Sequence, residues 1–275
     1  LFHRNPKFAS EVLYGTTNMI ISMNVKSMKQ KFLFDHTDHV KKITMTSEFI
    51  VSASKPGDGK SGKTKKKGKF NKLVEEQEIQ VIVWDVHSGT NIINFKPPLE
   101  EICDLFITFK NMYLVIIGKD YQGRDLILVY NFPDMVKYNK IDLVTRQLSD
   151  FSIYTVLQNP INDAIFITGG KENIRFWKIK GVVSGRNIVL NKIGRGKEFT
   201  SVLYDYEYYG DEDGNPPKNR DGSKAPIGKI QWVYLATTWG HLFQINYSKR
   251  EVEQVLKIHD DWITALQMTS DRRYA

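Results

Sequence analysis

The sequence lacks most features that would mark a secreted, membrane-spanning or helical protein. Its one cysteine, Cys103, excludes an internal disulfide and favours a reducing, intracellular location. No stretch approaches the roughly 18 consecutive apolar residues of a transmembrane helix, and no secretory signal opens the chain. Helical periodicity of amphipathic length is also absent, which favours an all-β protein. Because the chain begins with Leu1 and not with Met, we expect a piece of a longer protein.

Positive charge is scarce outside one stretch. The formal net charge is +8, but residues 55–72 hold eight lysines and one aspartate, which leaves about +1 for the rest of the chain. A duplex-binding face would need lysines and arginines spread over a surface. The sequence therefore predicts a nearly neutral body with one basic loop.

The sequence does contain a repeated apolar segment. Residues 79–89, IQVIVWDVHSG, alternate like a half-buried strand and end at a Ser-Gly turn. Looser copies recur, and the equivalent residues of all copies are Met23, Trp84, Tyr130, Trp177 and Ile245. Their separations are 61, 46, 47 and 68 residues, and removing two polar stretches of about 16 and 21 residues brings the long intervals near 45. This period predicts four-stranded propeller blades.

The repeat predicts an all-β chain, a β-propeller segment over residues 8–275. We expect four complete blades, at residues 35–98, 99–148, 149–197 and 198–257. Partial blades are expected at residues 8–34 and 258–275. A lysine-rich insertion (residues 55–78) falls between the second and third strands of its blade, and a polar insertion (residues 206–229) between the first and second. Since strands of a blade alternate in direction, the two insertions should lie on opposite faces.

Two histidines occupy the same place, just before the first strand of a blade. They are His36 and His259. A buried histidine here could hydrogen-bond a second-strand hydroxyl such as Ser52. A metal pair of His36 and His39 lacks further ligands of suitable spacing. Residues 211–222 begin like a calcium loop but lack its required glycine and glutamate, so we expect neither a metal nor a cofactor.

Residues 57–64, GDGKSGKT, match the nucleotide-binding pattern G-x-x-x-x-G-K-[ST]. That chemistry needs a following helix whose amides cradle phosphate. The next residues are mostly lysines and glycine, which disfavour a packed helix. A nucleotide-dependent enzyme that uses Lys63 and Thr64 stays an alternative, but we expect a solvated loop, no catalytic residues and no enzyme.

The lysine-rich insertion could also contact an acidic polymer such as a microtubule surface or RNA. Phe70 is its one aromatic residue, which disfavours nucleic-acid stacking. The alternative is a solvated insertion that contacts no partner. The candidate contact residues are Lys60, Lys63, Lys65, Lys66, Lys67 and Lys69.

Trp84-Asp85 and the histidine before the first strand resemble the WD-repeat β-propeller family. In that family a His, a Ser or Thr, an Asp and the Trp form a hydrogen-bonded set within a blade. The resemblance assigns these structural roles to His36, Ser52 and Trp84, while the lysine-rich insertion displaces the turn aspartate. Trp177 aligns with Trp84 in a later blade.

Residues 30–40, 118–124 and 173–181, together with the long fourth blade, resemble the ciliary and microtubule-associated propellers of this family more closely. Asp35 stands where glycine is usual. The resemblance implies a non-enzymatic scaffold of the cytoskeleton, at a centriole, basal body or cilium axoneme, that supports microtubule assembly or stability and ciliogenesis. It implies tubulin or neighbouring microtubule-associated proteins as partners and no membrane. An RNA-binding adaptor is the alternative.

Overall fold

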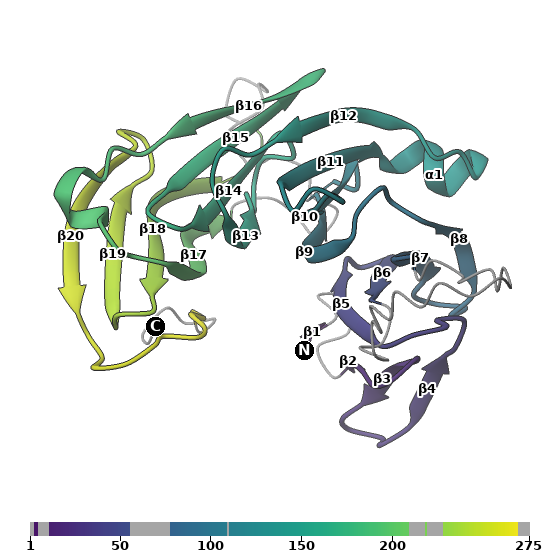
Figure 1. Ribbon diagram of the computed structural model, residues 1–275. Coiled ribbons are helices and arrows are strands. Elements are labelled where there is room, and N and C mark those ends of the chain that lie inside the picture. Colours follow the sequence, from purple (N-terminus) through teal and green to yellow (C-terminus); the bar gives the residue numbers. More distant parts are fainter. Residues whose placement is uncertain are drawn as a thin grey trace, which may run out of the picture.

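The computed structural model describes residues 3–4, 11–55, 78–108, 110–208, 218 and 228–268. Within these residues lie five antiparallel sheets of four strands each, one α-helix and one short 3-10 helix. Figure 1 shows the sheets side by side in an arc, each with one edge strand toward the inside of the arc and the other toward the outside. The predicted all-β propeller class is confirmed.

Each sheet is one blade, and its strands follow one another in chain order from the inside of the arc to the outside (Figure 1). The first sheet contains β1 (His3–Arg4), β2 (Glu11–Gly15), β3 (Ile20–Asn24) and β4 (Gln30–Leu33). The second contains β5 (Val40–Met45), β6 (Phe49–Ser54), β7 (Gln80–Asp85) and β8 (Asn91–Phe95). The third contains β9 (Glu101–Ile107), β10 (Tyr113–Lys119), β11 (Asp125–Asn131) and β12 (Leu143–Leu148).

The last two sheets follow the same order. The fourth contains β13 (Ile153–Gln158), β14 (Ile165–Gly170), β15 (Ile174–Lys180) and β16 (Val182–Asn187). The fifth contains β17 (Phe199–Tyr208), β18 (Gly228–Thr237), β19 (His241–Asn246) and β20 (Glu251–Lys257). The inner strands β5, β9, β13 and β17 contact one another in sequence, which places the blades around a common centre.

The two ends of the chain differ from the prediction of partial blades. At the start, β1 pairs with β2 and completes a four-stranded sheet. Strand β1 has only two residues, too few to show an alternation of apolar and polar side chains, so it could not be predicted. At the other end, described residues 258–268 form no strand of a sheet. They lie against the fifth blade, where Ile263 N donates to Thr237 O and Leu266 N donates to the Ser201 hydroxyl.

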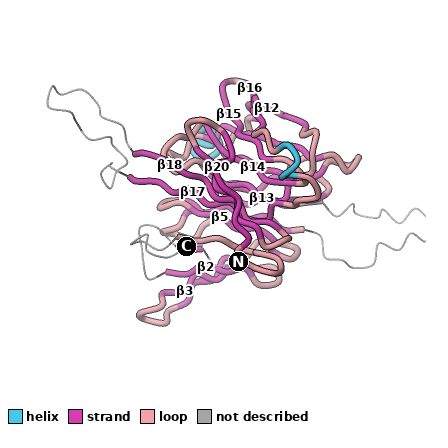
Figure 2. The backbone as a smooth tube through the Cα atoms, turned by 90° about the vertical axis from the view of Figure 1, so that its left-hand side faces the viewer, coloured by secondary structure: helices cyan, strands magenta, loops and turns pink. Residues whose placement is uncertain are grey.

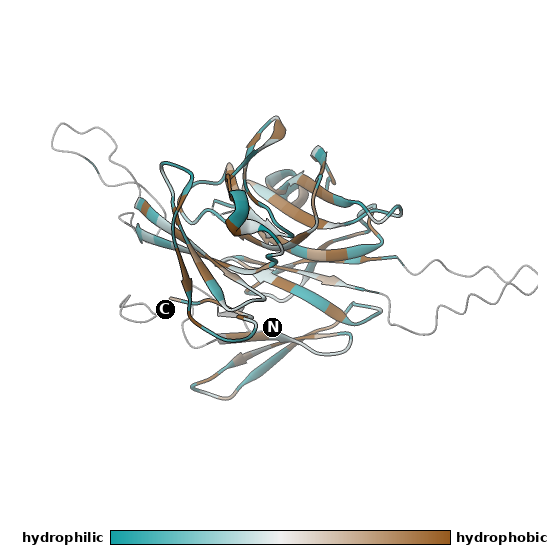
Figure 3. Cartoon of the chain, turned by 60° about the vertical axis from the view of Figure 1, so that its left-hand side comes forward, coloured by the Kyte–Doolittle hydropathy of each residue, from teal (hydrophilic) through white to brown (hydrophobic). Residues whose placement is uncertain are grey.

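Among the described residues the hydrophobic core forms four clusters, one between each pair of neighbouring blades. Alternate residues of one strand enter different clusters: Leu114 and Ile116 pack toward the second blade, whereas Val115 and Ile117 pack toward the fourth. The brown, apolar segments in Figure 3 accordingly follow the strands. Because both faces of a central strand are buried, its sequence is a continuous apolar run and not a strict alternation.

Strand β7 is more deeply buried than its sequence predicted. The sequence predicted a half-buried strand, but residues 80–84 are all buried. Val83 packs between the second and third blades, and Trp84 packs on the other face, against the first. The stretch therefore joins three blades.

A helix, α1 (Phe132–Tyr138), was not predicted. Asn131 caps its start, with its side chain accepting from Asp134 N, and Asn139 ends it in the left-handed conformation at φ 52°. Phe132 is buried and meets the Phe49 ring edge-on at 5.2 Å. This short helix thus ties the third blade to the second.

Candidate interaction surface

The second blade contains a buried polar cluster of the three residues proposed for it. His36 Nε2 lies 2.7 Å from the Ser52 hydroxyl, and Trp84 Nε1 donates to the same oxygen at 2.8 Å. Trp84 Nε1 can only donate, so the Ser52 hydroxyl accepts from it. Burial lowers the pKa of His36 to about 4, which agrees with a neutral ring.

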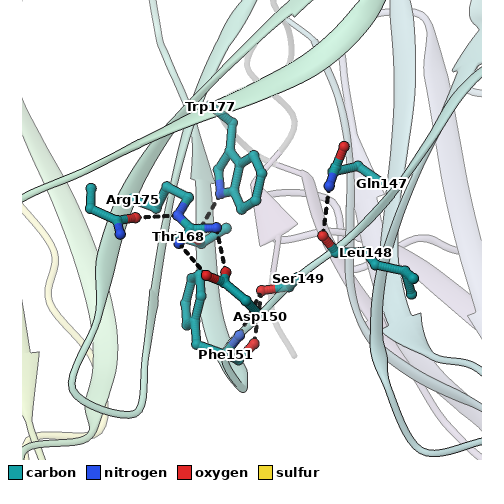
Figure 4. Close-up of polar contacts among 9 residues, drawn as sticks. Gln147, Leu148, Ser149, Asp150, Phe151, Thr168, Arg175 and Trp177 are labelled. Atoms are coloured by element: carbon teal, nitrogen blue, oxygen red, sulfur yellow. Dashed lines mark hydrogen bonds and ion pairs between the residues drawn. The ribbon is translucent and has the colours of Figure 1, made fainter.

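The fourth blade repeats part of this arrangement. Trp177 Nε1 donates to the Thr168 hydroxyl at 2.8 Å, and both residues are buried (Figure 4). Thr168 has the same register relative to Trp177 as Ser52 has to Trp84, because each tryptophan pairs with the residue two before its hydroxyl partner. The indole-to-hydroxyl bond is therefore a shared feature of two blades.

In the fourth blade, the Arg175 side chain lies next to Trp177. Its guanidinium contacts both carboxylate oxygens of Asp150, at 2.6 and 3.1 Å, and Asn187 Oδ1 accepts from its Nε (Figure 4). The charge lies 4.8 Å from the Phe151 ring centre and 5.0 Å from that of Trp177. This forked ion pair, flanked by two rings, lowers the pKa of Asp150. The role of Arg175 could not be predicted, because its partners come from separate segments of the chain.

Two aspartates stabilise turns. Asp85 Oδ1 accepts from Ser88 N at 2.6 Å and from the Ser88 hydroxyl at 2.8 Å, and these bonds lower the pKa of Asp85. In the third blade, Asp120 accepts from two backbone amides and from the Arg124 guanidinium. Asp85 belongs to the strand end and does not join the Ser52 cluster.

His259 is not arranged like His36. Its side chain is exposed, and Nδ1 accepts from Asp261 N at 3.1 Å. The strands that would supply a hydroxyl and a tryptophan to the blade that follows it do not occur among the described residues. Its predicted structural role stays a proposal.

The candidate lysines and residues 211–217 lie outside the described residues. The strands that flank the two insertions are described. The lysine-rich insertion connects β6 to β7, and the polar insertion connects β17 to β18. In Figure 2 the described ends of β17 and β18 point to the left side of the molecule. Near that end Tyr206 is 39% exposed.

Among the described residues, the side chains that could bind a metal lie apart from one another. They include no group of three or more histidine, cysteine, aspartate or glutamate side chains that could hold a metal ion. Burial raises the pKa of Cys103 to about 11, so its thiol is protonated near neutral pH. Asp85 is the last residue of β7 in an antiparallel sheet, whereas the nucleotide-binding motif requires a strand-to-helix unit.

No described helix has the length and apolar character that crossing a membrane requires. What the described blades present to solvent is their turns, their outermost strands and the insertion flanks. Such loops on a rigid frame suit the binding of other macromolecules.

No family model matches the chain. Among curated proteins it is 21% identical over 264 residues to WD repeat-containing protein 90 of Xenopus tropicalis, and 20% identical over 247 residues to that of Mus musculus. These matches cover 95% and 90% of the chain and about 12% of each relative. Centriole proteome protein 16 of Chlamydomonas reinhardtii is 23% identical over 191 residues, or 65% of the chain and 8% of that protein.

These matches confirm the resemblance to WD-repeat proteins that the sequence indicated. The matches extend across all five blades, and the blades have the antiparallel four-stranded form that the repeat predicted. The chain folds as propeller blades and is similar, over nearly all of its length, to WD repeat-containing protein 90.

Proposed function

We propose that the chain is part of a non-enzymatic scaffold on the microtubules of centrioles, basal bodies or axonemes. The observation that carries this proposal is the similarity, over 95% of the chain, to WD repeat-containing protein 90, joined by the match to a protein named for the centriole proteome. In this role the propeller supports microtubule assembly or stability, and thereby ciliogenesis.

The architecture supports a scaffold. Apolar strand residues are used in packing blade on blade, so a partner meets turns, outer strands and insertions. The two insertions leave strands β6 and β17, at connections that lie on opposite faces of an antiparallel blade. One propeller could therefore hold two partners at once.

The lysine-rich insertion supplies the proposed contact with tubulin or a neighbouring microtubule-associated protein. Its charge of about +7 over residues 55–72 stands on a body of about +1. An acidic polymer attracts such a segment mainly through salt-sensitive electrostatics. The contact residues proposed are the six lysines between positions 60 and 69.

Cosedimentation with purified microtubules tests this function. We expect the chain to pellet with microtubules at about 50 mM salt and to be released at about 300 mM. A variant with all six lysines changed to glutamine should lose most binding, while the matched change to arginine should keep it. A third variant removes six exposed charges elsewhere and controls for net charge, by changing Lys26, Lys29, Lys140, Lys178, Lys192 and Lys249 to glutamine.

Three outcomes contradict the proposal. Equal binding by the glutamine variant removes the lysines from the contact. Absence of pelleting at every salt concentration removes the direct microtubule contact. Release of the chain from microtubules by excess RNA, with tighter binding to RNA than to microtubules, favours an RNA-binding adaptor instead.

A further inference from the structure

A turn in the fifth blade carries three basic side chains around an exposed tryptophan. The turn joins β18 to β19, in the blade formed by β17 to β20 at one end of the arc (Figure 1). Lys197 Nζ lies 3.4 Å from His241 Nδ1 and 5.2 Å from the centre of the Trp239 ring. Lys257 Nζ donates to Trp239 O at 2.7 Å. We call these four residues the Trp239 cluster.

Hydrogen bonds hold the backbone of this turn. The buried Thr237 hydroxyl accepts from Trp239 N at 3.3 Å and from His241 N at 3.1 Å. Gly240 has a φ of 70°, and a Cβ there would clash with the His259 carbonyl, so the turn requires glycine. The Trp239 side chain is nevertheless 57% exposed. An aromatic side chain that is presented to solvent on a firmly held turn suits contact with another molecule.

The positive charge of the cluster is not neutralised by a neighbouring acid. None of the ion pairs formed among the described residues involves Lys197 or Lys257. Two carboxylates of adjacent segments, Glu172 and Asp261, accept hydrogen bonds from backbone amides instead. Burial and the two lysine charges lower the pKa of His241, so its ring is neutral near pH 7. The cluster therefore favours an anion.

The donors of the cluster indicate which anion fits. A lysine ammonium group can only donate, so His241 Nδ1 accepts from Lys197 and the proton of the neutral ring lies on Nε2. Two ammonium groups and one ring N–H thus face a ligand. A phosphate monoester matches them, because it carries a charge of about −1.5 to −2 near pH 7 and three acceptor oxygens. A carboxylate, or one phosphodiester of a nucleic acid, carries a single charge.

We propose that the Trp239 cluster binds a phosphorylated serine or threonine in an extended segment of a partner protein. The phosphate oxygens accept from Lys197, Lys257 and His241 Nε2, while an apolar residue beside the phosphate packs on Trp239. A nucleic acid fits less well, since it needs cations along many phosphates and the chain outside residues 55–72 has a net charge of about +1. This proposal does not depend on the microtubule contact.

An array of dodecapeptides with one central phosphoserine and varied flanking residues tests the proposal on the whole chain. By fluorescence polarisation, the selected peptides should bind about tenfold more tightly than copies with serine or glutamate at the centre. Lys197→Gln with Lys257→Gln should abolish this difference, and Trp239→Ala should weaken binding severalfold. The matched control is Lys178→Gln with Lys249→Gln, which removes the same charge from two exposed lysines elsewhere and should bind like the parent.

Phenyl phosphate gives a second measurement that does not depend on a peptide sequence. In isotope-labelled protein it should shift the indole N–H signal of Trp239, whereas benzoate, with one charge, should shift it much less. The variant with six glutamines in the lysine-rich insertion should respond like the parent, which separates this site from the proposed microtubule contact.

Four outcomes overturn the proposal. They are the absence of any bound phosphopeptide, equal binding of phosphorylated and unphosphorylated copies, equal binding by the two double-lysine variants, and displacement of every selected peptide by single-stranded RNA that itself binds more tightly. Inorganic phosphate should compete only weakly, because it lacks the residue that packs on Trp239. If it competes as well as the peptides do, the site binds free phosphate and not a partner segment.

Discussion

The indole N–H of Trp84 donates to the Ser52 hydroxyl at 2.8 Å, deep within the second blade. The same hydroxyl lies 2.7 Å from His36 Nε2, so one oxygen holds together strands β6 and β7 and the segment that enters the blade. Trp177 and Thr168 form the corresponding bond in the fourth blade at the same distance. These bonds fix neighbouring strands where packing alone would permit several arrangements.

Replacing Ser52 with alanine should destabilise the chain strongly. The change leaves the Trp84 N–H and His36 Nε2 buried without a partner, at a combined cost of about 2 to 4 kcal/mol in the free energy of unfolding. Urea denaturation followed by tryptophan fluorescence measures the change. The exposed Ser184→Ala in β16 is the control, and an equal loss in both variants would refute the role of the cluster.

Stability should decrease between about pH 7.5 and pH 5 because of His36. Burial lowers its pKa from 6.5 to about 4, so over this range the unfolded chain takes up a proton that the folded chain does not. The stability is complete above the unfolded pKa and decreases as pH falls toward the folded one. The expected loss is about 2 kcal/mol by about pH 5. Denaturation of the parent and of His36→Gln at both pH values should show this loss in the parent alone; an identical loss would contradict the assignment.

Asp35 occupies a backbone conformation that favours glycine. Its φ is 129°, and its side chain accepts from Asn91 Nδ2 at 3.2 Å. Asp35→Gly relieves the backbone strain, whereas Asp35→Ala keeps the strain and loses the hydrogen bond. We expect the glycine variant to be more stable than the alanine variant by about 1 to 2 kcal/mol. Thermal unfolding gives the order, and a more stable alanine variant would show that the conformation carries no strain.

Arg175 should resist even replacement by lysine. A lysine keeps the charge but loses the fork that contacts Asp150 and the planar contact with Phe151 and Trp177. We expect Arg175→Lys to cost about 1 to 2 kcal/mol. The exposed Arg186→Lys in the adjacent strand should cost less than about 0.5 kcal/mol. Calorimetry of both variants tests the difference, and similar values would mean that the cluster contributes nothing beyond charge.

The blade pattern could be predicted because packing on two sides forces apolar strands at a regular spacing. The Ser52 cluster was predictable for a related reason. Its three residues stand at fixed places relative to the strands, so the register brings them together.

Other features depend on contacts that a linear pattern does not reveal. Helix α1 spans seven residues, too few for an amphipathic period, although Asn131 and Asn139 mark its ends. Arg175 draws its partners from β15, β16 and the segment before β13.

Expansion microscopy of the tagged protein in ciliated cells tests the central claim most directly. The account predicts signal along the microtubule walls of centrioles, basal bodies or axonemes, together with loss of most of that signal when the six lysines become glutamine. Signal that is separate from these walls, or unchanged after the lysines are replaced, would contradict a scaffold that reaches microtubules through its basic insertion.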